Sequence, residues 1–187
     1  MSDKKVILKV RNLTKEFKIR AQKFGEQPQI LHALTDVSVD IYEGETLGII
    51  GESGCGKSTF GKCLVQLHKA TAGSVEYNGR NIFELKKEEL KNLKRDIQMV
   101  FQDPFSSLNP RKTVRESILE PLRLNGRHSA VEMEERVNEL MDTVGLAQRL
   151  AYSYPHELDG GRRQRIGIAR ALALQPEFIV CDEPVSA

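Results

Sequence analysis

The apolar residues of this chain follow two patterns that predict strands. Apolar and polar side chains alternate along residues 6–10 and 37–41, as in strands with one exposed face. Mainly apolar runs at 46–50, 97–101 and 178–181 predict buried strands. Together with the helices described next, these strands predict an α/β fold.

Helix signals are concentrated between residues 103 and 160. Thr113 with Glu116, and Ser129 with Glu132, have the spacing of a capping box, which satisfies the free N–H groups of a helix start. Apolar residues recur on one face of the second helix, and Pro121 should kink or end the first. We therefore expect a helical subdomain inserted into an α/β core.

Turns and further helices are predicted outside this region. Asn78-Gly79 favours the positive φ angles of a hairpin turn. The polar stretch 18–29 predicts a long loop or an insertion between strands. Further helices are predicted at about 58–67, 86–94 and 162–174.

Composition narrows the class of protein. Of the 187 residues, 40% are hydrophobic. The 28 Lys and Arg residues nearly balance the 26 Asp and Glu residues, which gives a net charge of +2. Such a small net charge gives no reason to expect a nucleic-acid partner. No apolar run approaches the roughly 18 residues that span a bilayer, and the N-terminus lacks the apolar core of a signal peptide. Three cysteines suit neither a disulfide framework nor a zinc site. We expect a cytoplasmic protein.

Residues 51–59, here called the phosphate loop, fit the pattern GxxxxGK[ST] and follow the apolar run 46–50. Backbone N–H groups of such a loop and of the helix after it surround phosphate. Lys57 would reach the outer phosphates of a nucleotide, and the Ser58 hydroxyl would be a ligand for Mg²⁺. The alternative is a glycine-rich turn without a ligand. The predicted nucleotide-binding residues of the loop are Gly51, Glu52, Ser53, Gly54, Cys55, Gly56, Lys57, Ser58 and Thr59.

Two carboxylates follow the apolar run 178–181. Ligands bind at the carboxyl ends of parallel strands, so Asp182 is predicted to hold Mg²⁺ and Glu183 to orient or deprotonate the attacking water. Gln102, at the end of another predicted strand, could touch the metal or that water. The alternative for all three is a set of solvated side chains at strand ends.

The order of these motifs, with Leu158-Asp159-Gly160-Gly161-Arg162 opening a helix, resembles the nucleotide-binding domain of an ATP-binding cassette (ABC) transporter. The sequences of Phe101–Arg111 and Tyr154–Leu158 are similar to those of the oligopeptide and dipeptide importer branch of this family. The resemblance implies a P-loop NTPase core with an antiparallel β subdomain and a helical subdomain. The expected divisions are 1–102 for the β subdomain and first part of the core, 103–160 for the helical subdomain, and 161–187 for the return to the core.

The resemblance also implies ligands and partners. Two such domains would close head to tail, with ATP and Mg²⁺ held between the phosphate loop of one and Asp159, Gly160, Gly161 and Arg162 of the other. Phe17 would stack on adenine, unless it packs into a sheet instead. Two transmembrane permease subunits, and indirectly an extracytoplasmic solute-binding protein, would be partners of an ATPase lying on the inner face of the cell membrane.

Two departures from the family pattern stand out. The family signature normally reads Leu-Ser-Gly-Gly-Gln, whereas this chain has Asp159 and Arg162 in place of the serine and glutamine. Asp159 is a good helix N-cap, but its charge would repel the partner's γ-phosphate; we expect Arg162 to compensate it. The sequence also ends at Ala187, before the family's Leu-Asp segment and the strand with the switch histidine. We therefore expect the isolated chain to be poorly stable and inactive as an ATPase.

Three other functions fit part of the sequence. A small-molecule P-loop kinase would explain Lys57 and Ser58, but not the Gly-Gly helix start ahead of an Asp-Glu strand. A non-transport ABC ATPase acting on nucleic acid would be expected to carry a long coiled coil or basic linkers. The third is a nucleotide-binding module without catalysis.

Overall fold

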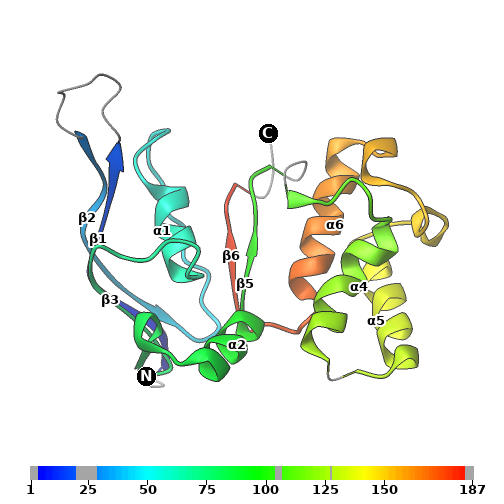
Figure 1. The fold of residues 1–187 in the computed structure, drawn as a ribbon, viewed down its shortest axis with the longest axis horizontal. Coiled ribbons are helices and arrows are strands. Elements are labelled where there is room, and N and C mark those ends of the chain that lie inside the picture. The colour runs from blue at the N-terminus through cyan, green and yellow to red at the C-terminus, as the bar shows by residue number, and fades with distance from the viewer. Residues whose placement is uncertain (1–3, 20–28, 104–106, 127, 184–187) are drawn as a thin grey trace. The chain divides into compact units, whose positions relative to one another are not determined.

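The computed structural model describes residues 4–19, 29–103, 107–126 and 128–183. The chain divides into two compact units, residues 1–91 and 92–187, each with its own secondary structure (Figure 1). The central part of the predicted loop, residues 20–28, lies outside the described residues.

The first unit is built on an antiparallel sheet with the strand order β2-β1-β3-β4. Side chains from β1 and β3 form a core beneath this sheet that includes Leu8, Val10, Leu13 and Val75. Helix α1 packs against β2. The elements are β1 (Val6–Ile19), β2 (Gln29–Tyr42), α1 (Lys57–Leu64), β3 (Ala72–Tyr77), β4 (Arg80–Asn81) and a 3-10 turn (Ile82–Glu84), and α2 (Lys87–Asp96) crosses into the second unit.

Strands β1 and β2 extend further than their alternating patterns predicted. Pairing continues to Ile19 with Gln29, so the connection between them is shorter than the predicted loop. The hairpin turn at Asn78-Gly79 is confirmed between β3 and β4, with φ angles of 48° and 77°. A local turn signal was therefore sufficient to place this connection.

The predicted strand at 46–50 is wrong. This segment has no regular secondary structure, and in the described part of the chain no strand pairs with it. Apolar character alone does not make a strand, because its backbone N–H and C=O groups need a neighbouring strand. Ile49 is 50% exposed and Ile50 98% exposed, although both were expected to be buried.

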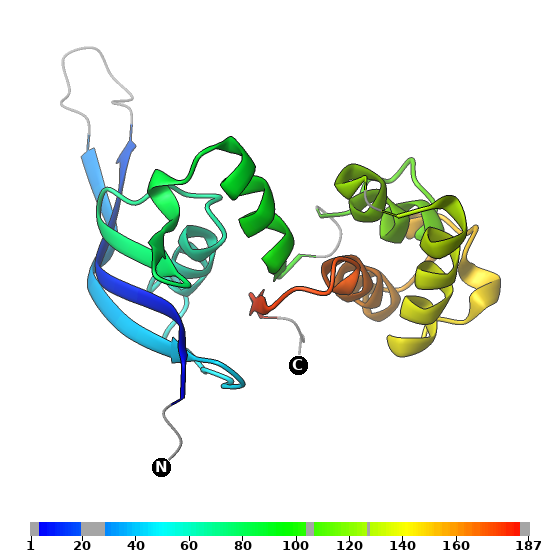
Figure 2. The ribbon, with the colours of Figure 1, turned by 90° about the horizontal axis from the view of Figure 1, so that it is seen from below.

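The second unit combines a two-stranded parallel sheet with a helical layer. β5 (Ile97–Val100) pairs with β6 (Phe178–Cys181) in a register that joins Ile97 to Phe178 and Val100 to Cys181. Helices α4, α5 and α6 pack on one another, as both ribbon views show (Figures 1 and 2). The remaining elements are α4 (Val114–Asn125), α5 (Ala130–Thr143), 3-10 turns (Gln148–Leu150 and Pro155–Glu157) and α6 (Gly160–Leu172).

Local capping chemistry fixes the starts of these helices. Both predicted capping boxes are present, at Thr113 with Glu116 and at Ser129 with Glu132. Pro121 was predicted to kink or end its helix; the second alternative is wrong, because α4 continues to Asn125. Proline removes one backbone hydrogen bond, but the complete burial of neighbouring apolar side chains holds the helix in place. These side chains belong to a core that contains Val114, Ile118, Leu119, Leu122, Val137, Leu140, Met141, Ile166 and Ala169.

Among the described residues, no helix has both the length and the apolar character that crossing a membrane requires.

Candidate functional site

The phosphate loop has the backbone that its glycines predict. Gly54 and Gly56 have φ angles of 82° and 100°, a region that favours glycine. A Cβ at Gly56 would lie 2.3 Å from the carbonyl oxygen of Ala33, so a side chain cannot fit there. Gly56 is also the N-cap of α1 and has no side chain to cover the first N–H groups of the helix. Residues 51–55 are exposed, which leaves the loop accessible to an anion.

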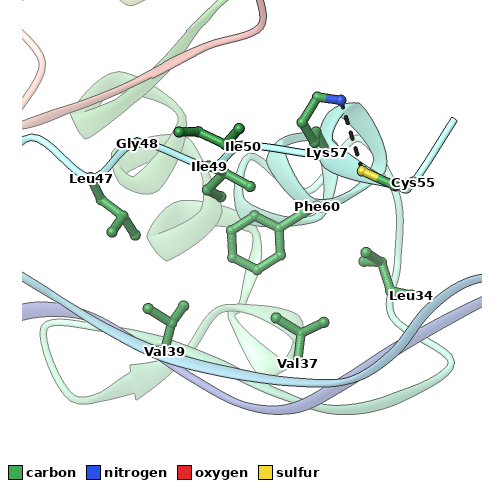
Figure 3. Close-up of a pocket in the computed structure, with 11 residues that line it drawn as sticks. Leu34, Val37, Val39, Leu47, Gly48, Ile49, Ile50, Cys55, Lys57 and Phe60 are labelled. Atoms are coloured by element: carbon green, nitrogen blue, oxygen red, sulfur yellow. Dashed lines mark hydrogen bonds between the residues drawn. The ribbon is translucent and has the colours of Figure 1, made fainter. Parts of the chain in front are cut away.

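The Lys57 side chain folds back across this loop. Its Nζ donates hydrogen bonds of 2.7 Å to the carbonyl oxygens of Gly51 and Glu52. It also lies 3.8 Å from Sγ of Cys55, the contact that Figure 3 draws. A Cβ at Gly51 would come within 2.7 Å of the same sulfur. Backbone carbonyl groups of the phosphate loop therefore position the Lys57 ammonium. Ser58 and Thr59 occupy the first turn of α1, where the helix N-terminus favours negative charge.

An apolar groove of about 440 Å³ adjoins the loop (Figure 3). Its polar boundary is formed by Cys55, Gly56 and Lys57, and the rest is apolar. A triphosphate does not match such a lining, so the exposed loop is the better anion site. The apolar residues of the groove are Leu34, Val37, Val39, Leu47, Ile49, Ile50 and Phe60.

Phe17, the candidate adenine contact, lies on β1 and is held by two neighbours. Nζ of Lys15 lies 4.8 Å from the centroid of its ring, and the His68 ring meets it edge to face at 5.2 Å. Burial, Lys62 and Lys15 lower the pKa of His68, so its imidazole is neutral near pH 7. The ring is half-buried, which is compatible with both packing and stacking. Sequence reasoning missed Lys15 and His68, because no local spacing connects His68 with β1.

The second unit brings two of the predicted catalytic residues together. Gln102 and Glu183 follow the adjacent ends of β5 and β6, and Nε2 of Gln102 donates a hydrogen bond of 2.5 Å to Oε2 of Glu183. The backbone N–H of Asp182 continues the ladder by donating to the carbonyl oxygen of Val100 at 3.0 Å. Both contacting side chains are exposed, so a carboxylate and an amide are available to a ligand at one point of the surface.

The start of α6 carries the second predicted nucleotide contact. Asp159 caps the helix, accepting a hydrogen bond of 2.8 Å from the backbone N–H of Arg162. The other carboxylate oxygen lies 3.4 Å from Nη1 of Arg162, so the two charges do form a pair. A Cβ added at Gly160 would meet nothing within 4 Å, and one at Gly161 only Oδ1 of Asp159 at 3.5 Å. The described residues therefore give no steric reason for glycine at position 160.

Among the described residues, no three His, Cys, Asp or Glu side chains lie close enough together to hold a metal ion by themselves. A magnesium ion at Ser58, Gln102 or Asp182 would need oxygen ligands from a nucleotide as well. This is the usual state of Mg²⁺ in phosphate-transfer sites.

The family model described as ABC transporter matches residues 34–186. The chain belongs to this family. It is 49% identical over 187 residues to the oligopeptide transport ATP-binding protein AppF of Bacillus subtilis, covering 100% of this chain and 57% of AppF. It is 50% identical to the oligopeptide transport ATP-binding protein OppF of Escherichia coli, covering 98% of this chain and 56% of OppF. The chain thus spans little more than half the length of these curated relatives.

The comparison with solved structures agrees with this ABC assignment. The ATP-binding cassette MJ0796, solved as a dimer in a post-hydrolysis state with ADP and Pi, is 37% identical and has a TM-score of 0.83. The match covers 96% of this chain and 75% of that structure. The predicted fold class, part of an ABC ATPase fold, is confirmed.

Proposed function

We propose that this chain forms the nucleotide-binding part of an ABC importer ATPase, which binds and hydrolyses ATP to drive uptake of oligopeptides or dipeptides. The observation that carries the proposal is the 2.5 Å hydrogen bond between Gln102 and Glu183, in a chain that also has a phosphate loop. The names of its relatives AppF and OppF support the substrate class.

In this proposal the phosphate loop binds the triphosphate of ATP. Positive φ at Gly54 and Gly56 turns the loop backbone around an anion, and the uncovered start of α1 adds further N–H donors. Lys57 would exchange its carbonyl contacts with Gly51 and Glu52 for phosphate oxygens. Phe17 would stack on the adenine.

Hydrolysis would take place beside Gln102 and Glu183. Glu183 would accept a proton as the water oxygen bonds to the γ-phosphorus and the bond to the β–γ bridging oxygen breaks, releasing ADP and phosphate. Gln102, which already contacts Glu183, would orient that water. Ser58, Gln102 and Asp182 would hold Mg²⁺, which when bound neutralises phosphate charge.

A second ATPase subunit would complete the site, in a head-to-tail pair. Gly160 supports this part of the proposal, because in the described part of the chain no atom beyond its own stretch of backbone lies within 4 Å of the position that its Cβ would occupy. A ligand from outside the chain could therefore approach the backbone there. Asp159 and Arg162 would then lie next to the partner's γ-phosphate, with the negative charge of one offset by the positive charge of the other. The contact would be made at the N-terminus of α6, which favours anions.

The remaining partners follow from the importer assignment. The ATPase would lie on the cytoplasmic face of the cell membrane, bound to two transmembrane permease subunits that receive solute from an extracytoplasmic binding protein. We retain the divisions at residues 102 and 160, with the helical subdomain between them. Nucleic acid is not expected as a partner, given the balanced charge.

Phosphate release by the purified full-length protein tests this function. We expect ATP hydrolysis without any added phosphoacceptor, and stimulation when the permease subunits and a peptide-loaded binding protein are present in lipid vesicles. ATP consumption only with a small-molecule acceptor would indicate a kinase instead. Stimulation by DNA or RNA, lost at high salt, would indicate an ATPase that acts on nucleic acid.

A further inference from the structure

The Phe17 ring is held by two groups to which the proposed function gives no role. The His68 ring meets it edge to face, with 5.2 Å between the ring centroids and 81° between the ring planes. Nζ of Lys15 lies 4.8 Å from the centroid of the Phe17 ring and donates a hydrogen bond of 2.8 Å to the carbonyl oxygen of Lys69. These contacts restrict the orientation of a ring that is only half-buried.

The segment that carries His68 is anchored to β1 through its backbone. The N–H of Thr71 donates to the carbonyl oxygen of Thr14 at 2.8 Å, and the N–H of Glu16 donates to the Thr71 hydroxyl at 3.0 Å. The backbone N–H of His68 donates to the carbonyl oxygen of Lys62, in the last turn of α1, at 3.1 Å. His68 is therefore fixed relative to both β1 and α1.

Two parts of the first unit connect the Phe17 ring to the phosphate loop. Phe17 pairs with Leu31 across the sheet. A Cβ at Gly56 would lie 2.3 Å from the carbonyl oxygen of Ala33, further along the same strand β2. Helix α1 begins directly after Gly56 and ends shortly before His68, after a rise of roughly 10 Å. The ring is thus joined to the phosphate loop through β2 and also through His68 and α1.

We propose that His68 is a positioning residue for the base of the nucleotide: it holds the Phe17 ring in place relative to the phosphate loop, so that adenine stacks on a ring that is already oriented. Lys15 covers one face of the ring, which leaves the other face for the base. This inference rests on the proposed ATPase function, with Phe17 as the adenine contact. Since an oriented ring costs less to order on binding, His68 should contribute to affinity for the base and not for the phosphates.

The aromatic character of His68 can be varied separately from its volume. Burial, Lys62 and Lys15 lower the pKa of His68, so near pH 7 a neutral imidazole presents its edge to Phe17. His68→Phe keeps an aromatic edge at this position, whereas His68→Leu keeps an apolar side chain without one. Rescue by phenylalanine but not by leucine would therefore identify the ring contact as the cause.

His32 offers a matched control in the same sheet. Its Nδ1 lies 3.0 Å from Oε1 of Glu16, which directly precedes Phe17 and pairs with His32 across the sheet. Because successive side chains of a strand point to opposite faces, His32 lies on the face opposite Phe17. His32→Leu therefore removes an imidazole from the same region and leaves the Phe17 ring contact in place.

Calorimetric titration of the full-length protein with a non-hydrolysable ATP analogue and with inorganic triphosphate tests the inference. For His68→Leu we expect the dissociation constant of the ATP analogue to rise on the order of fivefold, while that of inorganic triphosphate changes less than about twofold. His68→Phe and His32→Leu should match wild type for both ligands. An equal change for the two ligands in His68→Leu, or no change for either, would overturn the inference.

The ring contact can also be measured without nucleotide. In full-length protein with isotope-labelled histidine, Phe17→Leu should shift the ring-proton NMR resonances of His68, because the ring current of Phe17 is lost. The resonances of His32 should stay in place. Unshifted His68 resonances would show that the two rings are not in contact and would overturn the inference.

Failure of the proposed function gives a different result. A wild-type protein that binds neither the ATP analogue nor inorganic triphosphate would refute the nucleotide site, and the inference with it. A wild-type protein that binds the analogue more tightly than triphosphate, with the same preference in His68→Leu, would refute the role of His68 alone.

Discussion

Gln102 and Glu183 are 81 residues apart in the chain, yet the amide of one donates a 2.5 Å hydrogen bond to the carboxylate of the other. The parallel pairing of β5 and β6 produces this contact, because it places the carboxyl ends of both strands at the same edge. A carboxylate can deprotonate an attacking water, and an adjacent amide can orient it.

Glu183→Gln should separate hydrolysis from binding. The amide cannot accept the proton of the attacking water, so we expect kcat to fall at least about 100-fold while ATP affinity is retained. Single-turnover phosphate release and equilibrium nucleotide binding check the two parts. Glu177→Gln, just before β6, is the control and should hydrolyse ATP at the wild-type rate. Loss of ATP binding in Glu183→Gln would argue that the residue has a structural role instead.

Asp159→Ser should strengthen ATP-driven association. Serine also caps a helix, so the start of α6 should survive, while the negative charge that we propose to face the partner's phosphate disappears. Arg162 would then be free of its 3.4 Å ion pair. We expect the dissociation constant of the ATP-dependent dimer to fall several-fold, on the order of 1 kcal/mol, as measured by analytical ultracentrifugation. Unchanged or weaker association would contradict the repulsion between Asp159 and phosphate.

Gly160→Ala should affect the partner contact without affecting the fold. An added Cβ meets nothing within 4 Å, and alanine is a better helix former than glycine, so thermal stability should stay equal or rise slightly. ATP-dependent dimerisation should weaken nonetheless. Gly167→Ala, on the same helix and also without neighbours within 4 Å, is the matched control. Equal dimerisation in the two variants would remove the argument that α6 faces a partner.

Thr113→Ala should destabilise the helical layer in a pH-dependent way. The hydroxyl caps α4 and its loss should lower the free energy of unfolding by about 1 kcal/mol at neutral pH. Hydrogen bonds from the Thr113 backbone and hydroxyl lower the pKa of Glu116 below its ordinary value of 4.5. The stability contributed by this carboxylate is therefore present above pH 4.5 and lost as the pH falls below it.

Urea unfolding of the full-length protein across this pH range measures both effects. Thr113→Ala should show a smaller loss of stability on acidification than wild type. Thr143→Ala is the control, since its hydroxyl donates to the Glu139 carbonyl at the end of α5 and caps no helix start. An identical pH dependence in wild type and Thr113→Ala would show that this capping box does not contribute.

Features with local causes were predictable from the sequence. Both capping boxes, the Asn78-Gly79 turn and the Asp159 cap depend on residues within one turn of each other, and all are present. The strand-end position of Gln102 and Glu183 followed from the rule for parallel sheets.

Features that depend on distant neighbours were not predictable in the same way. The run 46–50 has the composition of a strand but no pairing partner among the described residues. The contact of Phe17 with His68 and the bond from Arg170 to Ser107 join residues that no sequence spacing relates. Pro121 remains inside α4 because core packing outweighs its local preference.

Nucleotide binding by Lys57→Ala, beside Lys62→Ala on the same helix, tests the central claim most directly. Both variants lose one ammonium from α1, but only Lys57 lies on the phosphate loop, bonded to the carbonyls of Gly51 and Glu52. Titration of the full-length protein with a fluorescent ATP analogue should show affinity reduced about 10- to 100-fold for Lys57→Ala and unchanged for Lys62→Ala. Wild-type affinity in Lys57→Ala would contradict the assignment of residues 51–59 as the ATP site.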